Sequence, residues 1–270
     1  MVTTSTKEPT WFSKIQIVGL RLYQVVSHVL FDPLELFRHL IELPAYFANL
    51  LRYASRQKEA SPSFRLRVRH LFPAPGDRRD FAGVTKGHYF HQDLHVARQI
   101  YNRNPARHVD VGSSTSGFIA HLLSFREVDY VDIRPLNTQI DGLNFIEGSM
   151  LALPFEDQSI GSLSALHSPE HVGLGRYGDP IDPNAWQKVI EEFQRVLMPG
   201  GVLYFSVPVG PERLEFDAHR VFAPSTILEE FDQLQLTSFS FVDDAGDFFP
   251  NRSPHEFQGW YGCGIFQFER

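Results

Sequence analysis

The sequence is short of cysteine and of positive charge. Its only cysteine, Cys263, cannot form an intrachain disulfide, which suits a reducing, cytoplasmic compartment. Its 25 Lys and Arg residues are outnumbered by 32 Asp and Glu residues, and the formal net charge is −7. Because proteins bind nucleic acid largely through positive charge, nucleic acid is not an expected partner.

The sequence also lacks a long uncharged apolar run. Residues 11–31 are apolar, but Lys14 and Arg21 interrupt them, so neither a membrane-spanning helix nor a signal peptide is expected. Their apolar side chains, and those of residues 32–56, recur at helical spacing. We expect either a helical hairpin that packs on the rest of the chain or on a second copy of it, or helices that lie on a membrane surface.

The chain changes character near residue 80. Residues 1–79 are expected to form an N-terminal helical extension and linker, in which Arg65, Arg67 and Arg69 would share one face of a strand over 65–72. Residues 80–270 alternate between strand and helix patterns and are expected to form one α/β domain.

The expected elements of this domain follow one another closely. Strands are predicted at 107–112, 128–133, 143–148, 159–167, 201–209, 236–244 and 262–270. Helices are predicted at 91–103, 116–125, 184–197 and 224–234. Such alternation predicts a mostly parallel sheet covered by helices on both faces, with ligands bound beyond the carboxyl ends of the strands.

The first predicted strand runs into the loop "DVGSSTSG" (110–117). Gly112 allows a tight turn, and the small polar residues leave backbone N–H groups open to a carboxylate or a small polar ligand. The loop lacks the further glycine of a pyrophosphate-binding loop, which disfavours a nicotinamide-dependent oxidoreductase. Asp132 follows Gly112 by about 20 residues, a spacing typical of an acid that binds ribose hydroxyls. The alternative is that Asp132 caps the turn before Pro135.

The order of the remaining motifs is that of a known enzyme class. "GSMLALPFED" (148–157) follows the third strand, and in "LMPGGVLYFSVP" (197–208) a helix ends at a glycine turn before an apolar strand. Together with the glycine loop and Asp132, this order resembles the class I S-adenosylmethionine-dependent methyltransferases. The resemblance implies a Rossmann-like methyltransferase sheet with an antiparallel last strand, and S-adenosyl-L-methionine as the cofactor.

The resemblance also implies the residues that contact this cofactor. The loop at Gly112 would face its methionine part, and Asp132 would hold its ribose. Ser149 replaces an acid that is frequent at this position, so one contact with the adenine amino group is missing. The expected cofactor-binding residues are Asp110, Gly112, Ser113, Ser114, Gly117, Asp132, Ile133, Arg134, Ser149, Met150 and His167.

Longer motifs match a narrower family. "GHYFHQDLHVARQI", "HVDVGSS", "EHVGLGRYGDPIDP" and "FDAHRVF" resemble a methyltransferase-like family of unknown function, which includes bacterial proteins of polysaccharide clusters and nematode proteins. This resemblance implies O-methylation of a carbohydrate or a related polar metabolite, with a small-molecule or glycan acceptor. The alternative is a non-catalytic binding or scaffolding protein in glycan assembly.

The segment "HSPEHVGLGRYGDPIDP" (167–183) follows the fourth predicted strand and would lie over the reactive carbon of the cofactor. Its first five residues spell the inverted zinc-protease pattern. Pro169 disfavours the helix that this pattern requires, and no metal site is expected. His171 is the predicted base for a hydroxyl acceptor, with Glu170 as its orienting partner or as the base itself. His219 is a second candidate base; alternatively, these histidines only cap strand ends.

Three further residues of this segment are candidates for contact with the acceptor. Arg176 and Tyr177 are predicted to hold an anionic or ring-shaped group. Asp179 is predicted to bind sugar hydroxyls, or a divalent cation together with Glu170. Upstream, the motif "GHYFHQD" would either fold over the cofactor through Tyr89 and His91 or simply pack.

Overall fold

The computed structural model describes residues 32–74, 78, 83 and 85–270. The helix predicted within residues 11–31 lies outside these ranges. The chain divides into two compact units, residues 1–83 and 84–270, and each is described by itself. No helix within the described ranges is both long and apolar enough to cross a membrane.

The described part of the first unit begins with the long helix α2 (Pro33–Arg56). As predicted, this helix begins at Asp32, whose carboxylate accepts hydrogen bonds from the backbone N–H groups of Leu34 and Glu35. Three short 3₁₀ turns follow: η1 (Gln57–Glu59), η2 (Pro62–Phe64) and η3 (Val68–His70). The strand predicted over 65–72 is therefore wrong, because no strand in the described part of the chain pairs with this segment and its backbone turns instead.

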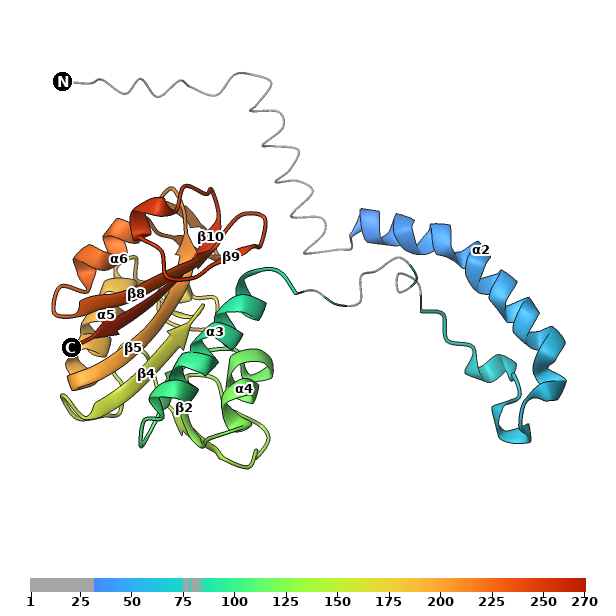
Figure 1. The fold of residues 1–270 in the computed structure, drawn as a ribbon, viewed down its shortest axis with the longest axis horizontal. Helices are drawn as coiled ribbons and strands as arrows, with labels where there is room; N and C mark the ends of the chain where they lie inside the picture. The colour runs from blue at the N-terminus through green and yellow to red at the C-terminus, as the bar shows by residue number, and fades with distance from the viewer. Residues whose placement is uncertain (1–31, 75–77, 79–82, 84) are drawn as a thin grey trace, which may run out of the picture. The chain divides into compact units, whose positions relative to one another are not determined.

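The second unit is built around an eight-stranded sheet with the order β3-β2-β1-β4-β5-β10-β8-β9 (Figure 1). The first five strands of this order are parallel, whereas β10 is antiparallel to both β5 and β8. This order, with one reversed strand before the last long one, is that of the Rossmann-like class I methyltransferase sheet and confirms the predicted fold class. The strands are β1 (Val109–Val111), β2 (Val128–Asp132), β3 (Leu143–Glu147), β4 (Ile160–Leu166), β5 (Leu197–Val209), β8 (Gln235–Val242), β9 (Phe248–Phe249) and β10 (Gly262–Glu269).

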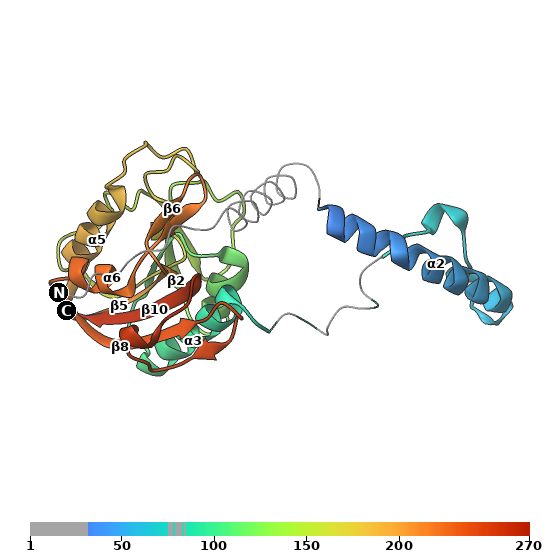
Figure 2. The same ribbon diagram turned by 90° about the horizontal axis from the view of Figure 1, so that it is seen from above.

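Helices cover both faces of this sheet. In Figures 1 and 2, α3 and α4 lie on one side of it, and α5 and α6 lie on the other. The bounds of these elements are α3 (His88–Arg103), the π-helical turn η4 (Thr115–Ile119), α4 (Ala120–Leu123), α5 (Ala185–Val196) and α6 (Pro224–Glu230). A small hairpin and two 3₁₀ turns complete the unit: β6 (Arg213–Glu215), β7 (His219–Val221), η5 (Pro169–His171) and η6 (Pro254–Glu256).

Alternating side chains of the central strands divide the core into two layers. Tyr204 of β5 and Cys263 of β10 belong to the buried cluster beneath α3 and α4. Phe205 of β5 and Phe266 of β10 point to the opposite face and belong to the cluster beneath α5 and α6. This alternation follows from the two-residue repeat of a strand, and it turns the only cysteine toward α3.

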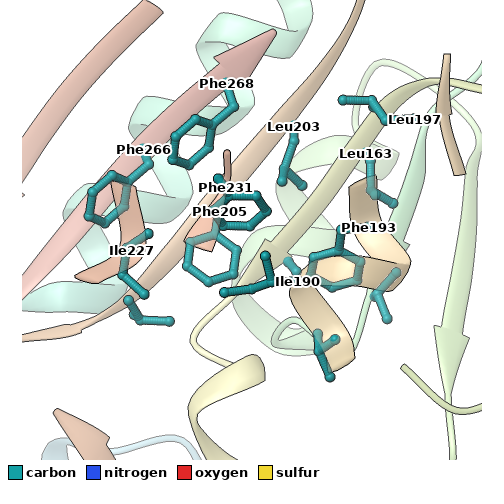
Figure 3. Close-up of a cluster of buried hydrophobic side chains, with 14 of the residues drawn as sticks. Leu163, Ile190, Phe193, Leu197, Leu203, Phe205, Ile227, Phe231, Phe266 and Phe268 are labelled. Carbon is teal, nitrogen blue, oxygen red and sulfur yellow. The ribbon is translucent and has the colours of Figure 1, made fainter. Parts of the chain in front are cut away.

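Aromatic rings fill the layer beneath α5 and α6 (Figure 3). The Phe231 ring, just after α6, lies with its centroid 4.5 Å from that of Phe268 and 5.1 Å from that of Phe205. Phe231 thereby joins the end of α6 to both β5 and β10, and its side chain is almost fully buried.

The substitution Phe231→Ala is expected to lower the free energy of unfolding by about 3–5 kcal/mol, because it removes a buried ring and leaves a cavity. Urea unfolding followed by circular dichroism measures the loss. Phe216→Ala is the matched control, since Phe216 is 73% exposed and its truncation should cost no more than about 0.5 kcal/mol. Equal losses in the two variants would contradict this account of the core.

Candidate functional site

The candidate site lies at the carboxyl ends of β1, β2 and β4, where the strand order reverses between β1 and β4. Two adjoining cavities open there, of about 590 Å³ and about 1420 Å³. Six residues line both cavities and so join them into one cleft: Gly112, Asp132, Arg134, His167, His171 and Tyr177.

Gly112 makes the sharp turn at the end of β1 possible. Its φ of 72° lies in the left-handed region, and its N–H donates to the Val131 carbonyl at 2.9 Å. A Cβ atom at this position would lie 2.5 Å from Met150 Cε and 3.2 Å from Ser168 Cβ. The loop therefore approaches the residues after β3 and β4 closely, which requires glycine.

Asp110 and Gly117, both predicted to bind the cofactor, line neither cavity. The buried Asp110 carboxylate accepts hydrogen bonds from the backbone N–H and hydroxyl of Ser113 and from the hydroxyl of Ser164. Burial raises the pKa of Asp110 to about 7, although these donors act in the opposite direction. Gly117 packs against Asp93 of α3. Both residues hold the loop from beneath rather than facing the cleft.

Asp132 faces the cleft, but its carboxylate is already fully hydrogen-bonded. Oδ1 accepts from the Arg134 backbone N–H at 2.8 Å and from Nε at 2.9 Å. Oδ2 accepts from Arg134 Nη2 at 2.6 Å and from the Tyr130 hydroxyl at 2.9 Å. Burial alone would raise the pKa of Asp132, but these donors outweigh it and lower the pKa below its usual value. A ligand hydroxyl can reach this carboxylate only by displacing Arg134.

Arg134 also contacts the far side of the cleft. Its guanidinium lies 4.5 Å from the centre of the Tyr177 ring, a cation–π contact. One side chain thus joins the end of β2 to the segment after η5.

The remaining residues predicted to bind the cofactor lie around the same cleft. Ile133, Ser149 and Met150 line the smaller cavity, and Ser113 and Ser114 line the larger one. The Ser149 hydroxyl accepts a hydrogen bond from the Leu151 N–H at 3.2 Å and so stabilises the turn after β3.

The segment 167–183 forms an irregular cover over this cleft rather than the helix of a zinc protease. His167 has a φ of 47°, a left-handed conformation that is strained for any residue other than glycine. Asp179 lines the smaller cavity, but its carboxylate accepts hydrogen bonds from the N–H groups of Gly173 at 2.6 Å and Tyr177 at 3.3 Å. Its oxygens are thereby used to shape the segment.

Glu170 and His167 form a buried ion pair at the floor of the larger cavity. His167 Nδ1 donates to Glu170 Oε1 at 2.9 Å, and both side chains are almost fully buried. Burial alone would raise the pKa of Glu170, but His167 outweighs it and lowers the pKa. Burial would lower the pKa of His167, but Cys263 and Glu170 outweigh it and raise the pKa. The second oxygen, Glu170 Oε2, is buried with no hydrogen-bond partner among the described residues.

His171 is held in one tautomer. Its Nδ1 lies 2.6 Å from the carbonyl of Ala218, which can only accept, and 3.2 Å from Arg176 Nη1, which can only donate. We assign the proton to Nδ1 because the contact with the carbonyl is the shorter one and Arg176 Nη1 already donates to the same carbonyl. Nε2 is then the basic nitrogen, 3.6 Å from Glu170 Oε1. Burial lowers the pKa of His171 below 6.5, while Glu170 opposes this shift. The ring is therefore neutral near pH 7, in the protonation state that a base needs.

His219, on β7, lies across the rim from His171, with 6.3 Å between the ring centroids. Its Nε2 is buried and has no hydrogen-bond partner among the residues that the structure describes. Burial lowers the pKa of this imidazole as well. Arg176 donates to the same Ala218 carbonyl that orients His171, at 2.9 Å. The three predicted catalytic residues and the predicted acceptor residues Arg176 and Tyr177 thus lie around one cavity.

Two residues of the cleft, His88 and Tyr261, were not expected from the sequence. Both line the larger cavity, and their rings lie with centroids 5.2 Å apart. Of the two residues that the sequence suggested near the cofactor, Tyr89 lines this cavity, whereas His91 stacks on Phe248 away from it. The motif "GHYFHQD" indicated that this segment borders the cleft. Because α3 begins at residue 88 instead of 91, His88 and Tyr89 face the cleft and His91 does not.

Comparisons with known proteins give one family and a set of similar structures. Residues 155–243 match the model of a Caenorhabditis protein family of unknown function, DUF268, which covers a third of the chain. No curated protein matches the sequence.

Among solved structures, a putative sarcosine dimethylglycine methyltransferase from Galdieria sulphuraria is 17% identical, with a TM-score of 0.48 over 66% of this chain and 85% of that one. The N-methyltransferase NodS from Bradyrhizobium japonicum WM9, in complex with S-adenosyl-l-homocysteine, is 12% identical, with a TM-score of 0.46 over 68% and 88%. The [4+2]-cyclase SpnF is 13% identical, with a TM-score of 0.48 over 70% and 88%. The fold assignment itself rests on the strand order described above.

The substitution Gly112→Ala tests how tightly the loop is packed. It should lower the free energy of unfolding by more than the roughly 1–2 kcal/mol of a left-handed alanine, because Ser168 Cβ would lie 3.2 Å from the added methyl group and the flexible end of Met150 would have to move aside. Gly200→Ala is the matched control, since Gly200 has a similar φ of 74° with open space around it. Urea unfolding measures both variants, and equal losses would show that the close approach at Gly112 is unimportant.

Proposed function

We propose that the protein is an S-adenosyl-L-methionine-dependent methyltransferase that methylates a hydroxyl oxygen of a carbohydrate or related polar metabolite. One observation carries this proposal. The loop at Gly112, the Asp132 carboxylate and the turn at Ser149 line a cavity that is also lined by His171, whose pKa is lowered and whose Nδ1 is bound to the Ala218 carbonyl. The first three occupy the positions at which the fold class holds its nucleoside, and the histidine supplies a base.

In this proposal the nucleoside part of the cofactor lies in the smaller cavity, between Gly112 and Met150. Its ribose hydroxyls take the place of the Arg134 guanidinium on Asp132, which is an ionised acceptor. The bound cofactor supplies an electrophilic methyl group on a sulfonium, and the chain's own residues position the acceptor beside it.

His171 is the proposed general base. The acceptor oxygen forms a bond to the methyl carbon while the carbon–sulfur bond breaks, and the hydroxyl proton passes to His171 Nε2. The Ala218 carbonyl keeps this nitrogen unprotonated beforehand, and the nearby Glu170 carboxylate stabilises the imidazolium that forms. A base of this kind contributes roughly 10²–10⁴-fold to the rate of such a reaction.

The polar character of the rim supports a polyhydroxylated acceptor. Glu170 Oε2 and His219 Nε2 are buried and have no hydrogen-bond partner in the part of the chain that the structure describes. A buried polar atom without a partner is costly. A sugar hydroxyl can donate to Glu170 Oε2, and it can donate to His219 Nε2 or accept from it, according to the tautomer of that ring.

Asp132→Ala should weaken S-adenosyl-L-methionine binding at least about tenfold, because a hydrogen-bonded charged acceptor contributes about 1.5–3 kcal/mol. Isothermal titration calorimetry measures the change. The matched variant is Arg134→Ala, which frees the carboxylate from its own cation. It should leave the affinity unchanged or raise it by up to about fivefold, since a half-exposed ion pair contributes at most about 1 kcal/mol.

Unchanged affinity in Asp132→Ala would remove the ribose assignment. A wild-type protein that gives no heat with the cofactor would overturn the enzymatic proposal and favour a non-catalytic scaffold in glycan assembly.

His171→Ala should leave cofactor binding intact and slow turnover by about 10²–10⁴-fold, because only the proton acceptor is lost. Release of S-adenosylhomocysteine with a panel of sugars and sugar alcohols measures turnover. His255→Ala, on the exposed turn η6, is the control and should keep full activity. A fully active His171→Ala enzyme would move the base to Glu170 or His219.

The pH profile provides a second readout of the same base. The pKa of His171 lies below 6.5 under the combined influence of burial, Glu170, Arg176 and His167. Since the neutral form is the active one, kcat/KM should be constant above about pH 7 and fall only as the pH decreases through that lowered pKa. An acidic limb centred above pH 7 would contradict the assignment.

A further inference from the structure

Three potential metal ligands converge at one point of the second unit, although they lie far apart in the sequence. A ring nitrogen of His88, a ring nitrogen of His167 and the Sγ of Cys263 all lie within 4.8 Å of one another. His88 begins α3, His167 follows β4, and Cys263 lies on β10. The fold alone brings these residues together.

Ordinary packing does not explain the state of His167. Its side chain is only 4% exposed, and its Nε2 has no hydrogen-bond partner among the described residues. Leaving a buried nitrogen unsatisfied costs about 1–3 kcal/mol. The Cys263 thiol beside it is fully buried and interacts with His167, whose pKa it raises. The other contacts that its Sγ makes among the described residues are long, 3.5 Å to Gln92 Oε1 and 3.9 Å to the Gly264 carbonyl.

The surroundings orient these ligands as the outer residues of a metal site do. Glu170 Oε1 binds His167 Nδ1 at 2.9 Å, which leaves Nε2 as the nitrogen available to an ion. A carboxylate behind a ligating histidine is the usual arrangement at zinc. Gln92, one turn after His88 on α3, accepts hydrogen bonds from Ser206 at 2.6 Å and from the protonated Cys263 thiol. The thiol gives up this second bond when it loses its proton to bind an ion.

We propose that His88, His167 and Cys263 bind one zinc-class divalent cation. Two imidazole nitrogens and a thiolate are a ligand set that such ions prefer, and three protein ligands leave a fourth tetrahedral position for water. Zinc bond lengths place such ligand atoms about 3.3–3.7 Å apart. Because the three ligand atoms lie up to 4.8 Å apart, the side chains have to move toward one another by at most about 1.5 Å to hold the ion.

The local pattern of residues 167–171 does not predict this site, because two of its three ligands lie far from that segment in the sequence. His88 and His167 both line the larger cavity, so an ion held by them would border the space assigned to the acceptor. The cation site does not depend on methyl transfer, and its test needs no cofactor.

Cobalt(II) is the probe. The full-length protein, purified without a metal-affinity tag and dialysed against a chelator, is titrated with Co²⁺ and followed by absorption spectroscopy. Because Cys263 is the only cysteine, a thiolate-to-cobalt charge-transfer band can arise only from this residue. We expect one Co²⁺ per chain with this band, and its loss when Zn²⁺ is added.

Cys263→Ser, which is nearly isosteric, should abolish the band, and His88→Gln and His167→Gln should weaken Co²⁺ binding at least tenfold. His91→Gln is the matched control on the same helix and should bind as the wild type does, because His91 stacks on Phe248 outside the cluster. Circular dichroism of each variant verifies folding.

Absence of the charge-transfer band at saturating Co²⁺ in the wild type would overturn the site. So would unchanged Co²⁺ affinity in both His88→Gln and His167→Gln. Neither result bears on cofactor binding, which calorimetry with S-adenosyl-L-methionine tests separately.

Discussion

The site depends on a chain of buried hydrogen bonds that joins β1 to β4 across the reversal in strand order. The neutral His108, whose pKa burial lowers to about 3, lies 2.9 Å from the Ser164 hydroxyl, which donates to Asp110. Asp110 also binds Ser113, whose hydroxyl accepts from the Leu166 N–H. Every link has a partner, so the network is inexpensive to bury and fixes the two loops that form the cleft relative to each other.

Above this network, one carboxylate organises the rim. Glu170 binds His167 on one side and lies 3.6 Å from His171 on the other. A buried negative charge of this kind stabilises positive charge on either ring, whether a proton arrives from a substrate or a cation is held nearby. The proposed base and the proposed cation site therefore share a neighbour without sharing a ligand, which keeps the two hypotheses separable.

Periodicity and spacing predicted the fold and the main residues that line the smaller cavity of the cleft. The distance from Gly112 to Asp132 and the glycine turn before β5 are local signals, and the structure places Gly112, Asp132 and Ser149 around one cavity. Side-chain partners were not predictable, because they are set by contacts across the fold. Asp110 lies beneath the loop with Ser164, and Asp132 is occupied by Arg134. The contact between His88 and Cys263 was likewise not predictable, because it depends on the position of β10 between β5 and β8 in the sheet.

The Arg134 guanidinium, shared between Asp132 and the Tyr177 ring, bears on the order in which two ligands enter the cleft. Tyr177 lines both cavities, so the side chain that occupies the Asp132 carboxylate also contacts the segment after η5. A first ligand that displaces Arg134 from the carboxylate removes this contact as well. Under the function proposed here, binding of the cofactor would loosen a segment that borders the acceptor, which favours cofactor-first addition in steady-state kinetics.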